Sequence, residues 1–199
     1  MDNKVVFDKE LIQRYDTFGP RYTSYPTAVQ FTTDYGADDY LEWVKYSNED
    51  PIPAPLSLYL HIPFCRKRCK FCYFKVFTDV KAPEVQRYVD ALCSEISMVS
   101  ELAVMGDRPF RFVYFGGGTP SFLSPKQLTK LADRLHQHIT WDGAEEVTFE
   151  CEPGTLTRPK LEAIREIGVT RLSLGVENLD DRILELNGRA HTTKEIDRV

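Results

Sequence analysis

From residue 56 onward, strand-like and helix-like segments alternate along the chain, and this order leaves few folds open. Short runs rich in Val, Leu, Phe and Tyr predict four strands, at Leu56–Ile62, Phe110–Phe115, Val147–Glu152 and Thr170–Glu177. Apolar residues at helical spacing predict three helices, at Pro83–Val104, Ser124–His138 and Thr157–Ile167. Repeated strand–helix units imply a parallel sheet, so we expect an α/β fold with about four βα units, open or barrel-like.

Two of these helices carry clear end signals. Ser124 is suited to the N-cap of the middle helix, with Pro125 at the first helical position and Gln127 at the capping-box position. Gly168 follows the last helix, where a left-handed C-terminal turn favours glycine.

Polar and apolar side chains alternate along three of the predicted strands, although a parallel strand covered on both faces is usually apolar throughout. The apolar rows are Leu56, Leu58, Leu60 and Ile62, then Val147, Phe149 and Cys151, then Leu172, Leu174 and Val176. We expect these rows to face the helices. The polar rows, which include Tyr59, Glu150 and Arg171, would then face a lumen that holds a polar ligand. A solvated face on an open sheet is the alternative.

The first 55 residues form a separate compositional zone, in which tyrosines are scattered among turn-forming residues. We expect short helices near Phe7–Tyr15 and Asp38–Tyr46, and an extended arm at Gly19–Thr27, because each proline biases its predecessor away from helix. A proline-rich linker, Pro51–Pro55, closes the zone. The expected domains are therefore an N-terminal arm and linker, residues 1–55, and a βα domain, residues 56–199.

The segment Arg189–Val199 follows the fourth predicted strand with a further helix-like pattern. Four βα units do not close a barrel, so we expect a partial barrel, from the N-terminal part of a longer protein or from a truncated reading frame. In that case the charges that face the lumen would be poorly compensated. These charged residues are Glu150, Glu152, Arg171 and Glu177.

The charge balance and the cysteine content narrow the possible functions. With 25 Lys and Arg against 30 Asp and Glu, the net charge of −5 is unlike that of a general nucleic-acid-binding protein, so we expect no nucleic-acid partner. The longest apolar runs are strand-length and the first residues carry no secretory signal, so we expect a cytoplasmic protein without a membrane segment. In a reducing cytoplasm, the five cysteines would be metal ligands or core thiols rather than disulfides.

Three of the cysteines, Cys65, Cys69 and Cys72, form a C-x₃-C-x₂-C loop directly after the first predicted strand. Three thiolates on a short loop can hold three irons of a 4Fe–4S cluster and leave the fourth iron open to a small chelating ligand. Structural zinc, with His61 as a fourth ligand, is the alternative. Cys93 and Cys151 lie in apolar patterns and are expected in the core.

A glycine-rich turn, Gly116-Gly117-Gly118-Thr119-Pro120, follows the second predicted strand and so lies at the same end of the sheet as the cysteine loop. Glycines allow the backbone to come close to a ligand. The turn lacks both the lysine of a phosphate-binding P-loop and the G-x-G-x-x-G spacing of a dinucleotide site.

Tyr59-Leu-His-Ile-Pro-Phe-Cys65 with the three-cysteine loop, followed by Gly-Gly-Gly-Thr-Pro, resembles the radical S-adenosylmethionine superfamily. More narrowly, the chain resembles the oxygen-independent coproporphyrinogen III oxidase group, and its arm Gly19–Thr27 resembles the N-terminal segment of the oxidase, which related haem chaperones lack. The similarity runs from about Leu11 to the end of the chain. It implies a partial (β/α) barrel of the radical S-adenosylmethionine type, with an N-terminal extension.

The resemblance implies a role for each matching residue. Cys65, Cys69 and Cys72 would ligate a 4Fe–4S cluster whose open iron binds S-adenosylmethionine. Tyr59 and the glycine turn would lie near the methionine end, Phe71 against the adenine and Glu150 at the ribose. The residues implied to contact this cofactor are Tyr59, Phe71, Gly117, Gly118, Thr119, Glu150 and Arg189. No other catalytic residue is assigned.

The resemblance also implies an activity. In the oxidase group, reductive cleavage of S-adenosylmethionine starts the oxidative decarboxylation of propionates to vinyl groups in porphyrin and haem biosynthesis. The implied enzyme is an oxidoreductase that acts on a tetrapyrrole such as coproporphyrinogen III and takes electrons from a reductant such as flavodoxin or ferredoxin. The alternatives are a related haem chaperone, and a methyltransferase or haem-degrading enzyme that acts on another substrate.

Two positions depart from the oxidase pattern. The position two residues after the third cysteine, usually a further cysteine, is Phe74, and the usual glutamine of the fourth strand is Glu177. Five basic residues also surround the cysteines. They would offset thiolate charge or attract carboxylates, or they form a solvated loop. These basic residues are Arg66, Lys67, Arg68, Lys70 and Lys75.

Overall fold

A computed structural model describes residues 55–102 and 108–199, together with residues 10, 36, 38, 39, 42, 46 and 49. The chain forms two compact units, Met1–Tyr46 and Ser47–Val199. In the first unit, residues 10, 38, 39, 42 and 46 are helical. The remaining residues of the two predicted N-terminal helices, the predicted arm Gly19–Thr27 and residues 51–54 of the linker lie outside the described residues.

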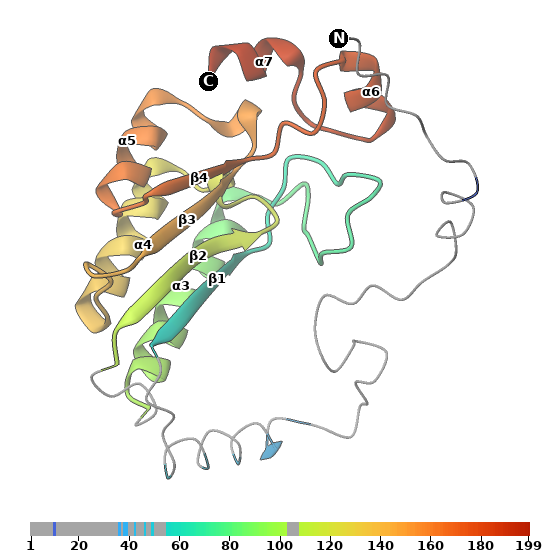
Figure 1. The fold of residues 1–199 in the computed structure, drawn as a ribbon. Helices are drawn as coiled ribbons and strands as arrows, with labels where there is room; N and C mark the ends of the chain where they lie inside the picture. Colours follow the sequence, from blue (N-terminus) through green and yellow to red (C-terminus); the bar gives the residue numbers. More distant parts are fainter. Residues whose placement is uncertain are drawn as a thin grey trace. The chain divides into compact units, whose positions relative to one another are not determined.

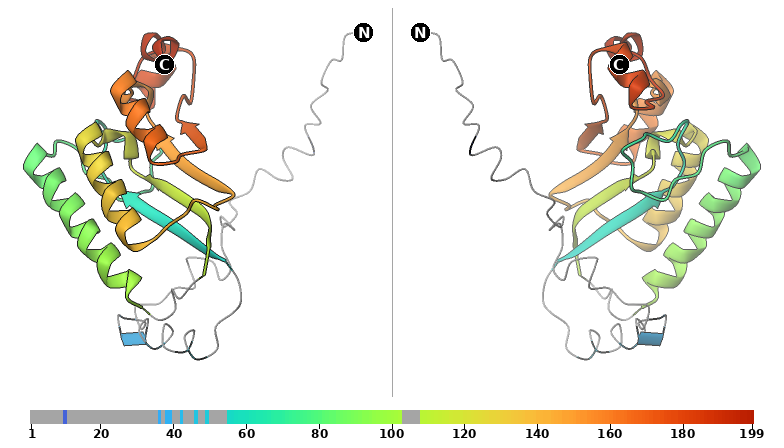
Figure 2. Two further views of the ribbon diagram at one scale, coloured as in Figure 1. Left: turned by 90° about the vertical axis from the view of Figure 1, so that its left-hand side faces the viewer. Right: turned by 90° about the vertical axis from the view of Figure 1, so that its right-hand side faces the viewer.

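The second unit is built on a four-stranded parallel sheet with the strand order β1-β2-β3-β4. The strands are β1 (Leu56–Ile62), β2 (Phe110–Gly117), β3 (Glu146–Cys151) and β4 (Arg171–Leu174). The helices that join them are α3 (Ala82–Ser100), α4 (Pro125–His138) and α5 (Arg158–Glu166). Figure 1 shows the strands side by side in chain order, and Figure 2 shows the three helices along one face of the sheet. The predicted α/β fold with repeated βα units is confirmed.

The C-terminal part of the chain adds two short helices, α6 (Asp181–Leu186) and α7 (Thr193–Arg198), beyond the carboxyl end of β4. Strand β4 is shorter than the predicted Thr170–Glu177 because the backbone turns after Leu174. The amides of Val176 and Asn178 each donate to the carbonyl two residues earlier, at 2.9 and 2.7 Å, as in γ-turns. Helix α3 ends at Ser100, before the predicted end at residue 104, which is not described.

The core lies between the sheet and the helices. The predicted apolar rows of β1 and β3 supply the buried residues Leu60, Ile62, Val147, Phe149 and Cys151. The helices pack against them with buried residues at helical spacing, which include Val85, Val89, Leu128, Leu131, Leu135 and Ile164. The apolar row of β4 lies on the same face, since Leu172 and Leu174 are in register with Phe149 and Cys151, but these two leucines remain 48% and 39% exposed.

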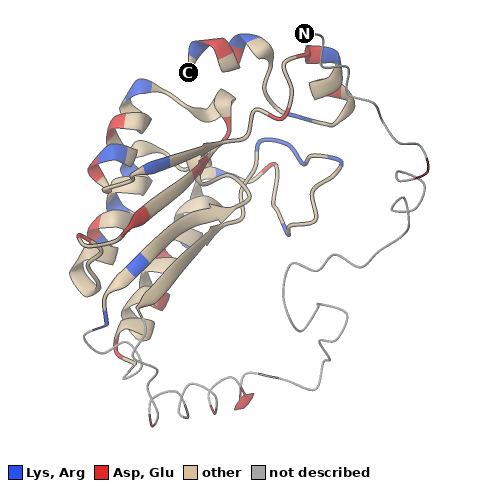
Figure 3. Cartoon of the chain, in the orientation of Figure 1, with Lys and Arg blue, Asp and Glu red and all other residues tan. Residues whose placement is uncertain are grey.

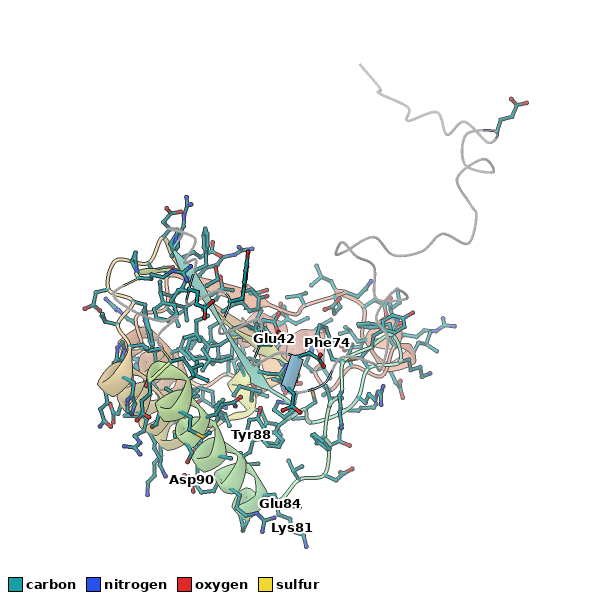
Figure 4. All side chains as sticks on the ribbon, turned by 90° about the horizontal axis from the view of Figure 1, so that it is seen from below. Glu42, Phe74, Lys81, Glu84, Tyr88 and Asp90 are labelled. Carbon is teal, nitrogen blue, oxygen red and sulfur yellow. The ribbon has the colours of Figure 1, made fainter. Side chains whose placement is uncertain are left out.

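Helix α3 shows how local sequence starts and anchors a crossover helix. The amide of Lys81 donates to the Glu84 carboxylate at 2.8 Å, which satisfies a backbone donor at the N-terminus. One turn further on, the Tyr88 hydroxyl donates to the carbonyl of His61 at 2.6 Å. Asp90 pairs with a lysine of α4 at 2.5 Å. Figure 4 labels Lys81, the residue before the helix, and Glu84, Tyr88 and Asp90 on it. These contacts tie α3 to β1 on one side and to α4 on the other.

Among the described helices, none combines the length and the hydrophobicity that a bilayer span requires.

Candidate functional site

A cavity of about 240 Å³ lies where the carboxyl ends of the parallel strands meet. The cysteine loop after β1, the glycine turn after β2, and the ends of β3 and β4 all contribute to its wall. The predicted site residues that line it are Cys65, Cys69, Phe71, Cys72, Gly117, Gly118, Thr119, Glu150 and Arg189. Residues from four βα units, spread over more than a hundred positions, are thus brought together at one end of the sheet.

The three cysteines of the loop are free thiols that lie close to one another. Burial is the largest effect on the pKa of Cys65 and raises it. The Thr119 hydroxyl, which donates to the sulfur at 3.4 Å, lowers this pKa, and the neighbouring Cys72 and Cys69 each raise it by a smaller amount. Deprotonation of these neighbouring thiols would require positive charge nearby, which a bound metal centre would supply.

The cysteine loop is anchored by backbone hydrogen bonds at its two ends and near its middle. The amide of Cys65 donates to Phe77 at 3.0 Å, and Phe77 donates in turn to Pro63 at 2.8 Å. Further along, the amide of Lys70 donates to the carbonyl of Asn187 at the end of α6, at 2.9 Å. The loop therefore has a defined backbone and is held by segments distant in sequence.

At two positions of the turn after β2, neighbouring atoms approach so closely that they leave no room for a Cβ atom, so glycine is required there. Gly117 has a φ of +111°, and a Cβ atom there would lie 2.6 Å from the His61 ring. A Cβ atom at Gly118 would lie 2.9 Å from the carbonyl carbon of Pro63 and 3.0 Å from Cys65 Sγ. Gly117 thus lets the end of β2 pack against His61 of β1, and Gly118 lets the turn pack against the start of the cysteine loop. The predicted approach of these glycines to a bound ligand stays a prediction.

Arg189 joins the C-terminal segment to the cysteines. Its guanidinium donates from Nη1 to Cys69 Sγ at 3.1 Å and from Nη2 to the carbonyl of Gly175 at 2.6 Å. The third donor, Nε, is buried and has no hydrogen-bond partner among the described residues. Buried donors in proteins are almost always paired, so this atom marks a place where an acceptor of a bound group fits.

Glu150 is held by a neighbouring strand. The Tyr114 hydroxyl of β2 donates to its carboxylate at 2.6 Å, and burial together with this carboxylate raises the pKa of Tyr114 to about 12. Sequence reasoning did not single out Tyr114. Tyr114 lies in register with Tyr59 of β1, and this strand register, which no local pattern specifies, was the signal that could have found it.

Tyr59 is the one predicted cofactor contact that does not line the cavity. It is 53% exposed, its hydroxyl lies 3.0 Å from His61 Nδ1, and its ring stacks on Tyr114 at 6.0 Å between centroids. His61, the fourth ligand of the zinc alternative, is likewise absent from the cavity wall. Within the described residues, no three His, Cys, Asp or Glu side chains form a group suited to a single metal ion.

The family model of the Radical SAM superfamily matches residues 59–199. The chain belongs to the radical SAM superfamily. The oxygen-independent coproporphyrinogen III oxidase of Escherichia coli is 35% identical over 186 residues, which cover 94% of this chain and 39% of that protein. The protein of the same name from Pseudomonas aeruginosa is 38% identical over 198 residues, which cover 98% of this chain and 42% of that protein.

A solved structure agrees with this assignment. The coproporphyrinogen III oxidase of Escherichia coli, described as a radical SAM enzyme, superposes with a TM-score of 0.78 at 31% identity, over 96% of this chain and 41% of that chain. The radical SAM chain therefore spans about two fifths of the length of these relatives.

Radical SAM proteins use a 4Fe–4S cluster and S-adenosylmethionine, as predicted for this chain. The residues present fit both groups. Three thiols stand on one loop beside a cavity, and the cavity wall holds an arginine with one buried, unpartnered donor. Thiolate ligands on a short loop suit an iron–sulfur cluster, and an arginine donor suits a carboxylate.

Two of the four charges expected to lack compensation have an oppositely charged partner, so that expectation was wrong for Glu152 and Arg171. Glu152 contacts Arg66 at 2.9 Å and His191 at 3.0 Å. Arg171 pairs with Glu146 at 3.1 Å, and Glu150 accepts from the Tyr114 hydroxyl. The pairing partners lie 25 to 86 positions apart along the chain, on other strands and loops, which is why inspection of single strands missed them.

Proposed function

We propose that Cys65, Cys69 and Cys72 ligate the 4Fe–4S cluster and that S-adenosylmethionine binds in the adjoining cavity. We further propose that the chain serves the radical-generating part of an oxygen-independent coproporphyrinogen III oxidase. The observation that carries this proposal is the meeting of the three thiols and Arg189, with its unpartnered Nε, at one cavity. The names of the relatives support the substrate, a tetrapyrrole with propionate side chains.

Different residues around the cavity would contact the cysteine ligands, the ribose and the adenine. Thr119 and Arg189 donate to the sulfurs of Cys65 and Cys69, which favours the thiolate form of these ligands. Glu150, oriented by Tyr114, would accept hydrogen bonds from the ribose hydroxyls, and Phe71, which is exposed beside the cavity, would stack on the adenine.

The bound cofactors supply one-electron chemistry that starts hydrogen abstraction from the substrate. The protein's own part is to hold the thiols, to fix the carboxylate and amino groups of the methionine end, and to keep the cavity wall in place. Gly117, Gly118 and Thr119 would line the methionine end, with Tyr59 nearby if its ring turns from its present stack on Tyr114.

The basic residues of the cysteine loop would serve two anionic partners (Figure 3). Lys67 and Arg68 line the cavity and are exposed, so we assign them to the substrate carboxylates. Lys70 and Lys75 are exposed and do not line the cavity. We assign these two lysines to an acidic reductant such as flavodoxin or ferredoxin, which positive charge would steer to the cluster. The described cysteines are all free thiols, which supports a cytoplasmic location.

The test is anaerobic reconstitution of the full-length protein, of which this chain would be the radical-generating part, with iron and sulfide, followed by incubation with S-adenosylmethionine, a reductant and coproporphyrinogen III. Mass spectrometry would follow two products, 5′-deoxyadenosine and the vinyl-bearing porphyrinogen. We expect both, and we expect Cys69→Ala to abolish both while Cys93→Ser retains them. Formation of 5′-deoxyadenosine without decarboxylation would overturn the substrate assignment. Stoichiometric haem binding with neither product would replace the proposal by the chaperone alternative.

A further inference from the structure

Glu152, at the carboxyl end of β3, is the centre of a buried ionic network beside the cysteine loop. It is 8% exposed. Its Oε2 accepts from Arg66 Nε at 3.0 Å, and its Oε1 accepts from Arg66 Nη2 at 2.9 Å, so the arginine contact is bidentate. Oε1 also lies 3.0 Å from Nδ1 of His191 and accepts from the Gly154 amide at 3.1 Å. The carboxylate is therefore fully satisfied by groups from three separate segments.

The histidine of this network has a polar neighbour at each ring nitrogen. The His191 side chain is 0% exposed. Its Nδ1 faces the Glu152 carboxylate and its Nε2 lies 3.1 Å from the carbonyl oxygen of Val176. The His191 ring thus bridges the Glu152 carboxylate and the backbone that follows β4. Glu152 is therefore held on one side by Arg66 and on the other by a fully buried imidazole.

The two side chains that hold the Glu152 carboxylate, those of Arg66 and His191, belong to the two segments that carry the sulfur contacts. Arg66 is adjacent to Cys65 in the cysteine loop. His191 is two residues after Arg189, which donates to Cys69 Sγ. Arg66 also donates to the carbonyl of Ala190 at 3.1 Å, which links the two segments directly.

The backbone of Glu152 is held in place by hydrogen bonds on both its amide and its carbonyl. Its amide lies 3.0 Å from Ser121 Oγ, and its carbonyl accepts from the Thr155 hydroxyl at 2.8 Å. Ser121 and Thr155 share a hydrogen bond of 2.5 Å, and the buried Lys160 donates to the carbonyl of Ser121 at 2.5 Å. The backbone of Glu152 is therefore fixed, and its carboxylate can hold two more distant segments in place.

We propose that Glu152 is a positioning residue for the cluster: through Arg66 it sets the cysteine loop, and through His191 it sets Arg189 against Cys69. This inference rests on the proposed function, since it concerns the same three thiols. Hydrogen bonds to cluster sulfurs stabilise the reduced, more negative state, so loss of the Arg189 contact lowers the reduction potential. Groups that orient metal ligands in this way typically change metal affinity by about 10- to 100-fold when substituted.

The test is the reduction potential of the reconstituted cluster, together with the rate of iron loss to a chelator, in Glu152→Gln. We expect a more negative potential and about 10-fold faster iron loss. Glu146→Gln is the matched control, since it removes a carboxylate from the other end of β3, where Glu146 pairs with Arg171 at 3.1 Å and lies outside the cavity wall. The control should keep both wild-type values.

A double variant separates positioning from general destabilisation. If Glu152 acts through Arg189, then Glu152→Gln should change the potential little in an Arg189→Lys background. Equal shifts in both backgrounds would overturn the proposal, as would an unchanged potential in Glu152→Gln. Should Glu152→Gln fail to fold, Arg66→Lys and His191→Gln replace it, because each keeps one partner of the carboxylate. Wild-type protein that binds no cluster would overturn the proposed function instead.

Discussion

The Tyr114 hydroxyl of β2 donates to Glu150 of β3 at 2.6 Å, so a carboxylate in the cavity wall is oriented by the neighbouring strand. The parallel register sets this contact, since Tyr114 is paired with Thr148, two residues before Glu150 on the same face of β3. The position of this carboxylate is therefore a property of the sheet rather than of a loop.

Replacing Tyr114 by phenylalanine removes this hydrogen bond and keeps the ring. Glu150 then loses the donor that orients it, and we expect S-adenosylmethionine to bind about fivefold more weakly, equivalent to about 1 kcal/mol. Calorimetric titration of reconstituted protein measures the change. Iron content should stay at the wild-type value, because the tyrosine lies outside the cysteine loop. An unchanged dissociation constant would mean that Glu150 needs no such orientation.

The contact between Tyr114 and Glu150 also predicts that the stability of the fold depends on pH. Burial and the Glu150 carboxylate raise the pKa of Tyr114 to about 12, above the value near 10 of an unfolded tyrosine. The folded state therefore favours the protonated phenol. The contribution of Tyr114 to the free energy of unfolding has its full value below about pH 10 and is lost as the pH rises towards 12. In urea unfolding, the stability difference between wild type and Tyr114→Phe should shrink from pH 9 to pH 11, and a constant difference would contradict the prediction.

The five cysteines should separate into two classes towards an alkylating reagent. Cys93 and Cys151 are 4% and 5% exposed, and burial raises the pKa of both thiols, that of Cys151 to about 12. In native protein without cluster, we expect mass spectrometry to find label on the three loop cysteines alone. Denaturant should then expose the remaining two. Native labelling of Cys151 would show that the carboxyl end of β3 opens.

Much of this architecture is predictable from local patterns. The alternation that buries Leu60 and Ile62 is visible in the sequence, because side chains of a strand point to opposite faces in turn. The cysteine loop and the glycine turn are predicted at one end of the sheet because each follows a strand. Both predictions depend on a few neighbouring residues.

The pairings between distant residues are not predictable in this way. Arg66 and Glu152 are 86 positions apart, and Glu152 and His191 are 39 apart. Which carboxylate meets which cation depends on loop conformation and strand register, which no local pattern specifies. The exposure of Leu172 and Leu174 is likewise not predictable from the apolar row of β4, because it depends on which other segments cover that row.

Two helix N-termini offer a test of local stability. At α4, Ser124 Oγ accepts from the Gln127 amide at 3.3 Å, and the Gln127 side chain accepts from the Ser124 amide at 2.9 Å, as the predicted capping box requires. Ser124→Ala should cost about 1 kcal/mol, or roughly 2–4 °C in Tm. Thr157 at the start of α5 makes no side-chain cap hydrogen bond. Thr157→Ala is therefore the control, and thermal melting should show the smaller change for it.

Substitution of Gly117 and substitution of Gly118, the two glycines after β2, should have different effects on cofactor binding and iron content. A Cβ atom at Gly117 would meet the His61 ring, which can turn aside, although the φ of +111° adds strain. A Cβ atom at Gly118 would meet the backbone of Pro63 and Cys65 Sγ, neither of which can yield without moving the cysteine loop. We therefore expect Gly117→Val to weaken S-adenosylmethionine binding while the chain still takes up about four irons. Gly118→Ala should instead lower the iron content itself. Iron analysis and calorimetry on the two reconstituted variants distinguish these effects, and full iron loading of Gly118→Ala would contradict the close packing of the two loops.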